Sequence, residues 1–141
     1  MSLANLRTTI LAQLNAAITA DAHGNTFTWY KQIPAQVATP CGFLHFPGGH
    51  YQETMGAAQR TRRMRFTVTV LFMQGGSVLE AQDDVDALVE GAGSVDVALD
   101  GLSLSPDASM TPTITDWSFG PIEMNGTPYI GTVFNGWFLV G

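Results

Sequence analysis

The fold of this protein is decided by RTRRMRFTVTVLFMQ, residues 60 to 74. The even positions from residue 64 onward are all apolar: Met64, Phe66, Val68, Val70 and Phe72. The odd positions begin with charged and hydroxyl side chains: Arg63, Arg65, Thr67 and Thr69. Because successive side chains of a β-strand point to opposite faces of the sheet, this alternation predicts a strand with one buried face. β-branched residues from 67 to 70 disfavour a helix, so we predict a long central strand from Arg60 to Gln74.

The size and composition of the chain set outer limits on its class. A chain of 141 residues is long enough to bury a core, and we expect one domain spanning residues 1–141. Its charged share of 13% is well below the usual value of about 25%. A surface with so few charges fits a protein that packs against copies of itself. It fits equally well the chance variation in composition that is expected of a small protein. The net charge of −6 argues against a free-standing nucleic-acid-binding protein.

Cysteine usage and hydropathy exclude further classes. Cys41 is the single cysteine, so an intrachain disulfide and a metal site of four cysteines are both excluded. No run of about 18 apolar residues marks a membrane span. The N-terminal stretch also lacks the continuous apolar segment of a signal peptide. We therefore expect a protein that is made, or assembled into something larger, in a reducing cytoplasm.

Periodicity and turn signals place the remaining elements. An apolar stripe with helical spacing predicts an amphipathic helix from Ser2 to about Ala22. Ser77 and Glu80 match a capping box, which predicts a second helix that runs to about Glu90. Short strands are expected at residues 26–30 and 42–46, and a further one is considered at residues 95–100.

Asn125-Gly126 is a strong signal for a two-residue hairpin turn near the end of the chain. Centring the turn there places Gly120 opposite Gly131 and Ile114 opposite Trp137. Asn135-Gly136 is a competing turn signal, which we interpret as a bulge. The predicted fold class is α+β: a mainly antiparallel twisted sheet, two helices packed on one face, a long inter-strand arm and a C-terminal β-hairpin.

The arm is PGGHYQETMGAAQRT, residues 47 to 61, which shows no apolar period of strand or helix. Pro47 and two glycines are expected to break the preceding strand. Long loops without secondary structure are uncommon in compact domains and are usually functional or disordered. We favour an arm that orders against a neighbouring molecule, with a simple mobile loop as the alternative.

Catalytic and metal-binding motifs are not evident. His45 and His50 lie near Glu53, but their spacing matches no helical ligand pair and a flexible Gly-Gly separates them. No serine lies in a nucleophile elbow, and neither Gly-Gly pair belongs to a phosphate-binding loop. We therefore predict no catalytic residues, no metal and no cofactor, and we expect a protein that is not an enzyme.

Two charge clusters stand out. The basic cluster holds four of the six basic residues, namely Arg60, Arg62, Arg63 and Arg65. The acidic cluster lies along one side of the predicted second helix, which carries no basic residue. It consists of Glu80, Asp83, Asp84, Asp86 and Glu90. Either cluster alone is typical of a solvated face. Together they are complementary between copies, and a head-to-tail contact of this kind closes into a ring if its rotation divides a full turn. Alternatively, the acids face a central channel and repel a passing phosphate backbone.

The order of the elements resembles that of the tail-terminator (tail-completion) proteins of long-tailed bacteriophages. The resemblance rests on the opening helix, the arm, the arginine-led strand, the acidic second helix and the final aromatic hairpin. It implies a virion protein, assembled in the host cytoplasm, that forms a homohexameric ring on the head-proximal end of the tail tube. Such a ring ends tube polymerisation and offers a face to the head connector (stopper), while DNA passes through the lumen without specific binding.

The resemblance also assigns roles to two groups of residues. The four arginines are expected at a subunit boundary. Contacts with a neighbouring subunit or the tube are expected from Gly48, Gly49, His50, Tyr51, Gln52, Glu53 and Met55.

The competing interpretation is a small-molecule-binding or enzymatic α+β domain of conical shape. Its cavity wall would use five aromatic residues that are otherwise ordinary core residues: Trp29, Phe43, Phe66, Trp117 and Trp137. An enzyme of this kind needs a buried acid or histidine. Asp116 is the carboxylate expected within a buried strand.

Overall fold

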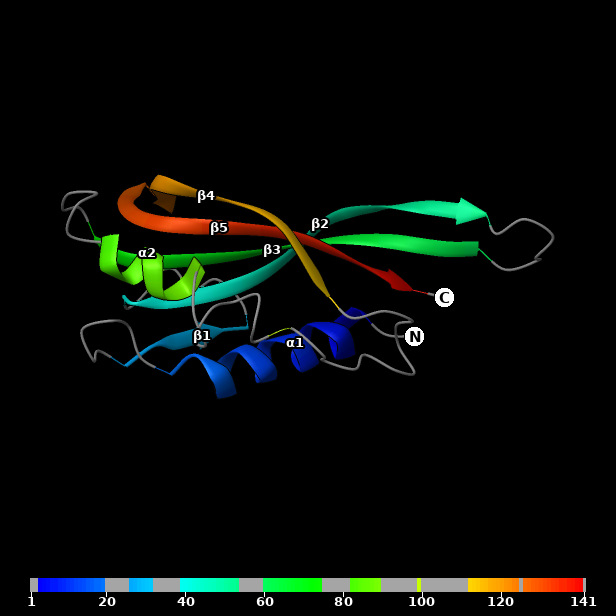
Figure 1. Ribbon diagram of the computed structural model, residues 1–141, viewed down its shortest axis with the longest axis horizontal. Coiled ribbons are helices and arrows are strands. Elements are labelled where there is room, and N and C mark those ends of the chain that lie inside the picture. Colours follow the sequence, from blue (N-terminus) through cyan, green and yellow to red (C-terminus); the bar gives the residue numbers. More distant parts are fainter. Residues whose placement is uncertain are drawn as a thin grey trace.

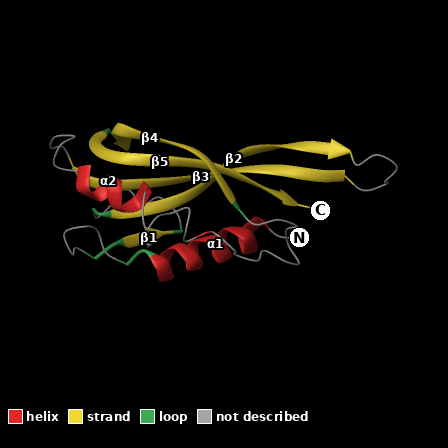
Figure 2. Cartoon of the chain, in the orientation of Figure 1, coloured by secondary structure: helices red, strands yellow, loops and turns green. Residues whose placement is uncertain are grey.

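The computed structural model describes residues 3–19, 26–31, 39–53, 60–74, 82–89, 99, 112–124 and 126–140. These residues form a five-stranded sheet in the order β1-β2-β3-β5-β4, with helices beside it (Figures 1 and 2). The elements are α1 (Leu3–Ala17), β1 (Thr28–Tyr30), β2 (Cys41–Glu53), β3 (Arg60–Gln74), α2 (Gln82–Val89), β4 (Thr113–Met124) and β5 (Thr127–Val140). The sheet is mixed, because β1 pairs with β2 in parallel and the other neighbours are antiparallel. The predicted α+β class is confirmed.

The central strand has the bounds that its alternation predicts. β3 runs from Arg60 to Gln74 and lies between β2 and β5. Phe66, Val68 and Val70 on its even face are 1% exposed or less. On the odd face Arg65 is exposed and Thr67 is half-buried. The pattern of one buried and one polar face therefore holds for this half of the strand.

α1 packs through Leu6, Ile10 and Leu14, which form the predicted apolar stripe and are all buried. The helix ends at Ala17, earlier than the predicted end near Ala22. The Trp29 side chain meets this end of the helix, where its Nε1 atom donates a hydrogen bond of 3.0 Å to the Ile18 carbonyl oxygen. That carbonyl is one of the groups that a helix end leaves without an intrahelical partner.

The main core lies between the helices and the even face of β3. Leu6 of α1 and Val85 of α2 belong to the same buried cluster as Phe66 and Phe138. The rings of Phe66 and Phe138 pack with their centroids 6.0 Å apart. A smaller cluster of Cys41, Phe43, Leu71 and Tyr129 forms on the odd side of the sheet. Leu71, at an odd position near the end of β3, therefore gives this face an apolar contact as well.

The arm is a paired β-hairpin over most of its length, so the prediction of an extended loop was wrong. β2 continues to Glu53 and pairs with β3 from Gly48–Arg65 to Glu53–Arg60. Pro47 and the glycines do not end the strand, because the register shifts between His45 and Gly48 and pairing then resumes. This end of the hairpin extends beyond α1 and α2 (Figure 1). No described helix packs on it there, which is consistent with a sequence that shows no apolar period. Residues 54–59 lie outside the described part.

The closing hairpin turns at Gly126, whose φ of 80° is the left-handed conformation that favours glycine. Gly120 lies opposite Gly131, as the turn signal predicts. Ile114 lies opposite Gly136, and not opposite Trp137 as predicted. The reason is a bulge between Ile114 and Asp116, which places the extra residue in β4 at Thr115 and not at 135–136.

Two further predictions concern segments that are described only in part. The predicted capping box of the second helix lies outside the described residues, and the described part of α2 begins at Gln82. Leu99 is the one described residue of the strand considered at 95–100, and it is helical and buried. A strand there was therefore wrong at that residue.

Cys41 is fully buried, and burial raises the pKa of its thiol from 9.0 to about 11, with a hydrogen bond to the Leu71 backbone acting in the opposite direction. The thiolate fraction below pH 9 is then about 100-fold lower than in the unfolded chain. We expect the folded protein to react with a thiol reagent at least about 100-fold more slowly than the denatured protein. Equal labelling rates in native buffer and in denaturant would contradict this prediction.

The raised pKa of Cys41 also makes stability depend on pH. Because the folded-state pKa is the higher one, the contribution of the protonated thiol to stability is complete below pH 9 and is lost between pH 9 and about 11.

Candidate interaction site on the sheet

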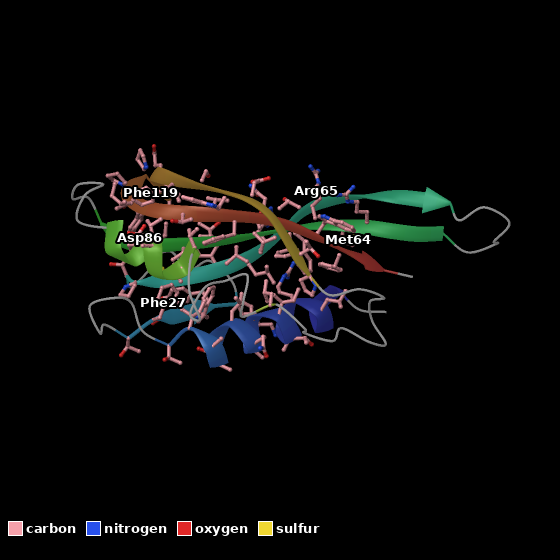
Figure 3. The ribbon with its side chains drawn as sticks, in the orientation of Figure 1. Phe27, Met64, Arg65, Asp86 and Phe119 are labelled. Atoms are coloured by element: carbon pink, nitrogen blue, oxygen red, sulfur yellow. The ribbon has the colours of Figure 1, made fainter. Side chains whose placement is uncertain are left out.

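A hollow of about 320 Å³ opens at the junction of β3, β4 and β5. It is lined by Arg63, Arg65, Phe66, Thr67, Thr115, Asp116, Asn135, Gly136 and Trp137. We call this group the basic hollow. Arg65 and Trp137 are direct partners in the β3–β5 register, as are Thr67 and Asn135. These residues occupy odd positions, so they share the sheet face opposite to the main core. Figure 3 shows Arg65 on the side of the sheet away from α1.

Trp137 positions one of the two guanidinium groups. The guanidinium carbon of Arg63 lies 4.1 Å from the centroid of the Trp137 ring. Such a cation–π contact contributes about 0.5–1 kcal/mol at an exposed site and favours the position of the guanidinium over the indole. The Arg65 side chain is exposed, and within the described part of the chain its guanidinium group has no hydrogen bond or ion pair. One arginine is thus held in place, and the second is free to meet a partner.

A polar network holds the base of the hollow. The Asn135 amide nitrogen donates a hydrogen bond of 2.6 Å to Asp116 Oδ1, and the Thr67 hydroxyl lies 3.4 Å from Asn135 Oδ1. The Thr115 hydroxyl is within reach of both the Asn135 carbonyl oxygen, at 3.2 Å, and Asp116 Oδ2, at 3.3 Å. The bulge brings Thr115 and Asp116 together against Asn135. The ionised lining therefore consists of two guanidinium groups and one carboxylate, so the hollow is net cationic.

A second hollow, of about 210 Å³, lies beside α2. It is lined by Leu88, Val89, Ile114, Thr115, Asp116, Trp117 and Phe134. Trp117 is 47% exposed, although large apolar side chains are usually covered. Because β4 is the last strand of the sheet, its outer edge carries backbone groups that no described strand pairs. We call α2 together with Trp117 the α2–Trp117 surface.

The structure separates the two predicted charge clusters within one molecule. Arg63 and Arg65 line the basic hollow, whereas Asp86 is exposed on α2. Figure 3 shows Arg65 and Asp86 well apart along the long axis of the molecule. Among the described residues these clusters therefore make no contact in one chain.

For the other predicted contact residues, the structure describes either the backbone position alone or no position. Arg60 and Arg62 lie at the far end of β3, opposite Glu53 and Tyr51. Asp83 and Asp84 belong to α2. The residues of the arm that lie in β2 are Gly48, Gly49, His50, Tyr51, Gln52 and Glu53. Glu80, Glu90 and Met55 lie outside the described part.

The aromatic residues of the competing interpretation do not converge on one cavity. Phe66 packs in the main core, and Phe43 packs in the small cluster on the opposite face. Trp117 is exposed and Trp137 stacks on Arg63. Asp116 is also exposed, so the expectation of a buried acid was wrong. The bulge at Thr115 explains this, because it lies in β4, which has no neighbouring strand on its outer side among the described residues.

Sequence reasoning did not predict that Thr115 and Asn135 line the site, or that Trp137 makes a cation–π contact with Arg63. The available signal was Asn135-Gly136, which marked an irregularity without showing which strand held the extra residue. Among the described residues, no group of three or more His, Cys, Asp and Glu side chains is placed to hold a metal ion. No described helix has the length and apolar character needed to cross a membrane.

The sequence matches no known protein family and no curated protein. The fold, however, is similar to that of a chain in the virion of a native gene transfer agent particle. The two chains share 15% sequence identity and superpose with a TM-score of 0.53. The likeness covers 95% of this chain and 94% of the other. It therefore concerns the whole fold and not one shared hairpin.

Proposed function

We propose that this protein is a structural virion component that forms a homohexameric ring on the head-proximal end of a phage tail tube. The observation that carries the proposal is the likeness of fold, over nearly the full length of both chains, to a chain of a virion. The ring ends tube polymerisation and presents its other face to the head connector. The protein acts through contacts between proteins and not through catalysis.

Two features of the sheet support a role in assembly. The β2–β3 hairpin extends beyond the helices, and residues 48–53 lie in this part (Figure 1). β1 pairs only with Cys41 to Phe43, so the rest of the outer edge of β2 has no partner strand among the described residues. In this role the hairpin contacts the tube or the next subunit. An open sheet edge offers backbone donors and acceptors to such a partner.

Charge fits a ring that surrounds DNA. The net charge of −6 repels a phosphate backbone, so DNA passes the ring without being held. The basic residues are few and gather in β3, where four of the six are found. The arginines are therefore assigned to contacts between proteins.

Mass and tube length test this proposal together. Native mass spectrometry and negative-stain images of the purified protein are expected to show rings of six copies. When the protein is added to the polymerising tail tube protein of the same virion, tubes are expected to stop at shorter lengths. A version in which an Asn-Gly turn replaces residues 51–62 should still fold but lose this effect, because it lacks the end of the hairpin. A protein that stays monomeric and leaves tube length unchanged would refute the proposal.

A further inference from the structure

We infer that the basic hollow of one copy receives the α2–Trp117 surface of a second copy. This inference rests on the proposed ring, and it names the partner of the candidate site. The contact joins two arginines to the carboxylates of α2 and to the exposed indole beside them.

The chemistry of the hollow selects a carboxylate ligand. Arg63 lies over the Trp137 ring, which offers no hydrogen-bond acceptor in the ring plane, so the N–H groups of its planar fork remain available to a carboxylate. Arg65 lines the same hollow, and its guanidinium group has no hydrogen bond or ion pair in the described structure. Two guanidinium groups of this kind form bidentate hydrogen bonds with carboxylates. A phosphate backbone offers anions as well, but the net charge of −6 opposes the approach of a polyanion.

The same chain supplies a surface with matching chemistry. Residues 77–90 contain five acidic residues and no basic residue, and Asp86 is exposed on α2. Trp117 lies next to this helix, because it lines one hollow together with Leu88 and Val89. An exposed indole binds a guanidinium group through its face, as Trp137 already binds Arg63. The α2–Trp117 surface therefore presents both groups that arginine prefers.

The geometry requires the contact to form between molecules. The basic hollow lies mainly on the odd face of the sheet, whereas α2 packs against the even face through Val85 and Leu88. Asp86 and Arg65 are also well separated along the molecule (Figure 3). The two surfaces adjoin at Thr115 and Asp116, which line both hollows, but they lie mainly on different faces of the sheet. Their contact is therefore head-to-tail and leaves one of each open at the ends of any incomplete assembly. In a closed ring every basic hollow and every α2–Trp117 surface is in contact with a neighbouring copy.

Charge reversal tests the hollow. Arg63→Glu with Arg65→Glu is expected to weaken the contact by about 30-fold or more, because paired arginine and tryptophan residues dominate such interfaces. Lys31→Glu is the matched control, since it makes the same charge change per residue at an exposed position on the opposite edge of the sheet. Native mass spectrometry should show dissociated subunits for the double variant and rings for the control. The slow labelling of Cys41 verifies that each variant is folded.

Mixing two variants tests the direction of the contact. The second variant carries Asp83→Lys, Asp84→Lys and Asp86→Lys, and it is also expected to be monomeric. A mixture with the arginine variant holds one intact hollow and one intact α2–Trp117 surface. The reversed, acidic hollow of the first variant is also complementary to the reversed, basic α2 of the second. The mixture should therefore give rings in which the two variants alternate, although each variant alone is monomeric. Combining the arginine and aspartate reversals in a single chain restores opposite charges and should restore the ring.

The possible failures are distinguishable. Rings that persist in the arginine variant, or a mixture that gives no assemblies containing both variants, overturn this contact and leave the proposed ring intact. A wild-type protein that stays monomeric, even with the tube present, overturns the proposed function and this contact with it.

Discussion

Replacing Phe66 with alanine is expected to lower the free energy of unfolding by about 3–5 kcal/mol. Phe66 is 1% exposed and lies in the main core, where its ring packs against that of Phe138. Its ring also lies close over Gly136 of β5, so its removal leaves a void bounded by the rigid backbone of the sheet. Such a void cannot collapse easily, and the loss is large beside a total stability of about 5–15 kcal/mol. Urea denaturation followed by circular dichroism measures it.

Phe66→Leu is the matched control for this void. Leucine keeps much of the apolar volume, so we expect a loss of about 1.5 kcal/mol or less. All three proteins should be compared at one protein concentration, because assembly makes apparent stability depend on concentration. Equal losses for alanine and leucine would show that shape and not cavity volume determines the effect.

Replacing Gly131 with valine is expected to destabilise the protein by about 3 kcal/mol or more, since it overpacks a site with a fixed backbone. A Cβ atom at this position would lie against the Val70 carbonyl oxygen, closer than real Cβ atoms approach any atom. It would also meet Ile122 Cδ1 at 2.9 Å and Leu71 Cδ2 at 3.1 Å. The two side chains can shift, but the carbonyl belongs to the strand paired with β5. The thermal unfolding midpoint should fall accordingly.

Gly120→Val is the control, because Gly120 is the direct partner of Gly131 in the hairpin. Among the described residues other than its two chain neighbours, none would place an atom within 4 Å of a Cβ at this position. Valine also has a higher strand propensity than glycine, so the change should be neutral or slightly stabilising. If both valine variants lose the same stability, the strand backbone and not the close contact at Gly131 is responsible.

Patterns within short stretches of sequence predicted those features of the fold that depend on neighbouring residues in the chain. The alternation of β3 and the Asn125-Gly126 turn each depend on neighbouring residues, and both were predicted correctly. The bulge at Thr115 and the register shift after His45 depend on the partner strand, so the sequence alone did not reveal them. The prediction of a loop at residues 48–53 was wrong for the same reason.

The candidate site was predicted only in part. Arg63 and Arg65 were identified from charge, because four arginines in one short stretch are conspicuous in a chain with six basic residues. Their neighbours Asp116 and Asn135 come from two other strands, and a shifted register brings them to the hollow. Exposure of Trp117 follows from the place of β4 at the edge of the sheet.

The strand order has a consequence for the route of folding. β2–β3 and β4–β5 are hairpins of neighbouring strands, whereas β3 joins β5 across a long separation, for example Arg62 with Val140. Closing that separation is the slow entropic step, and until then each hairpin has an unpaired side. In a crowded solution, the second hairpin of one chain can then zip onto β3 of another, which gives a domain-swapped pair with the same strand contacts. Refolding at low concentration therefore favours the correct single-chain sheet.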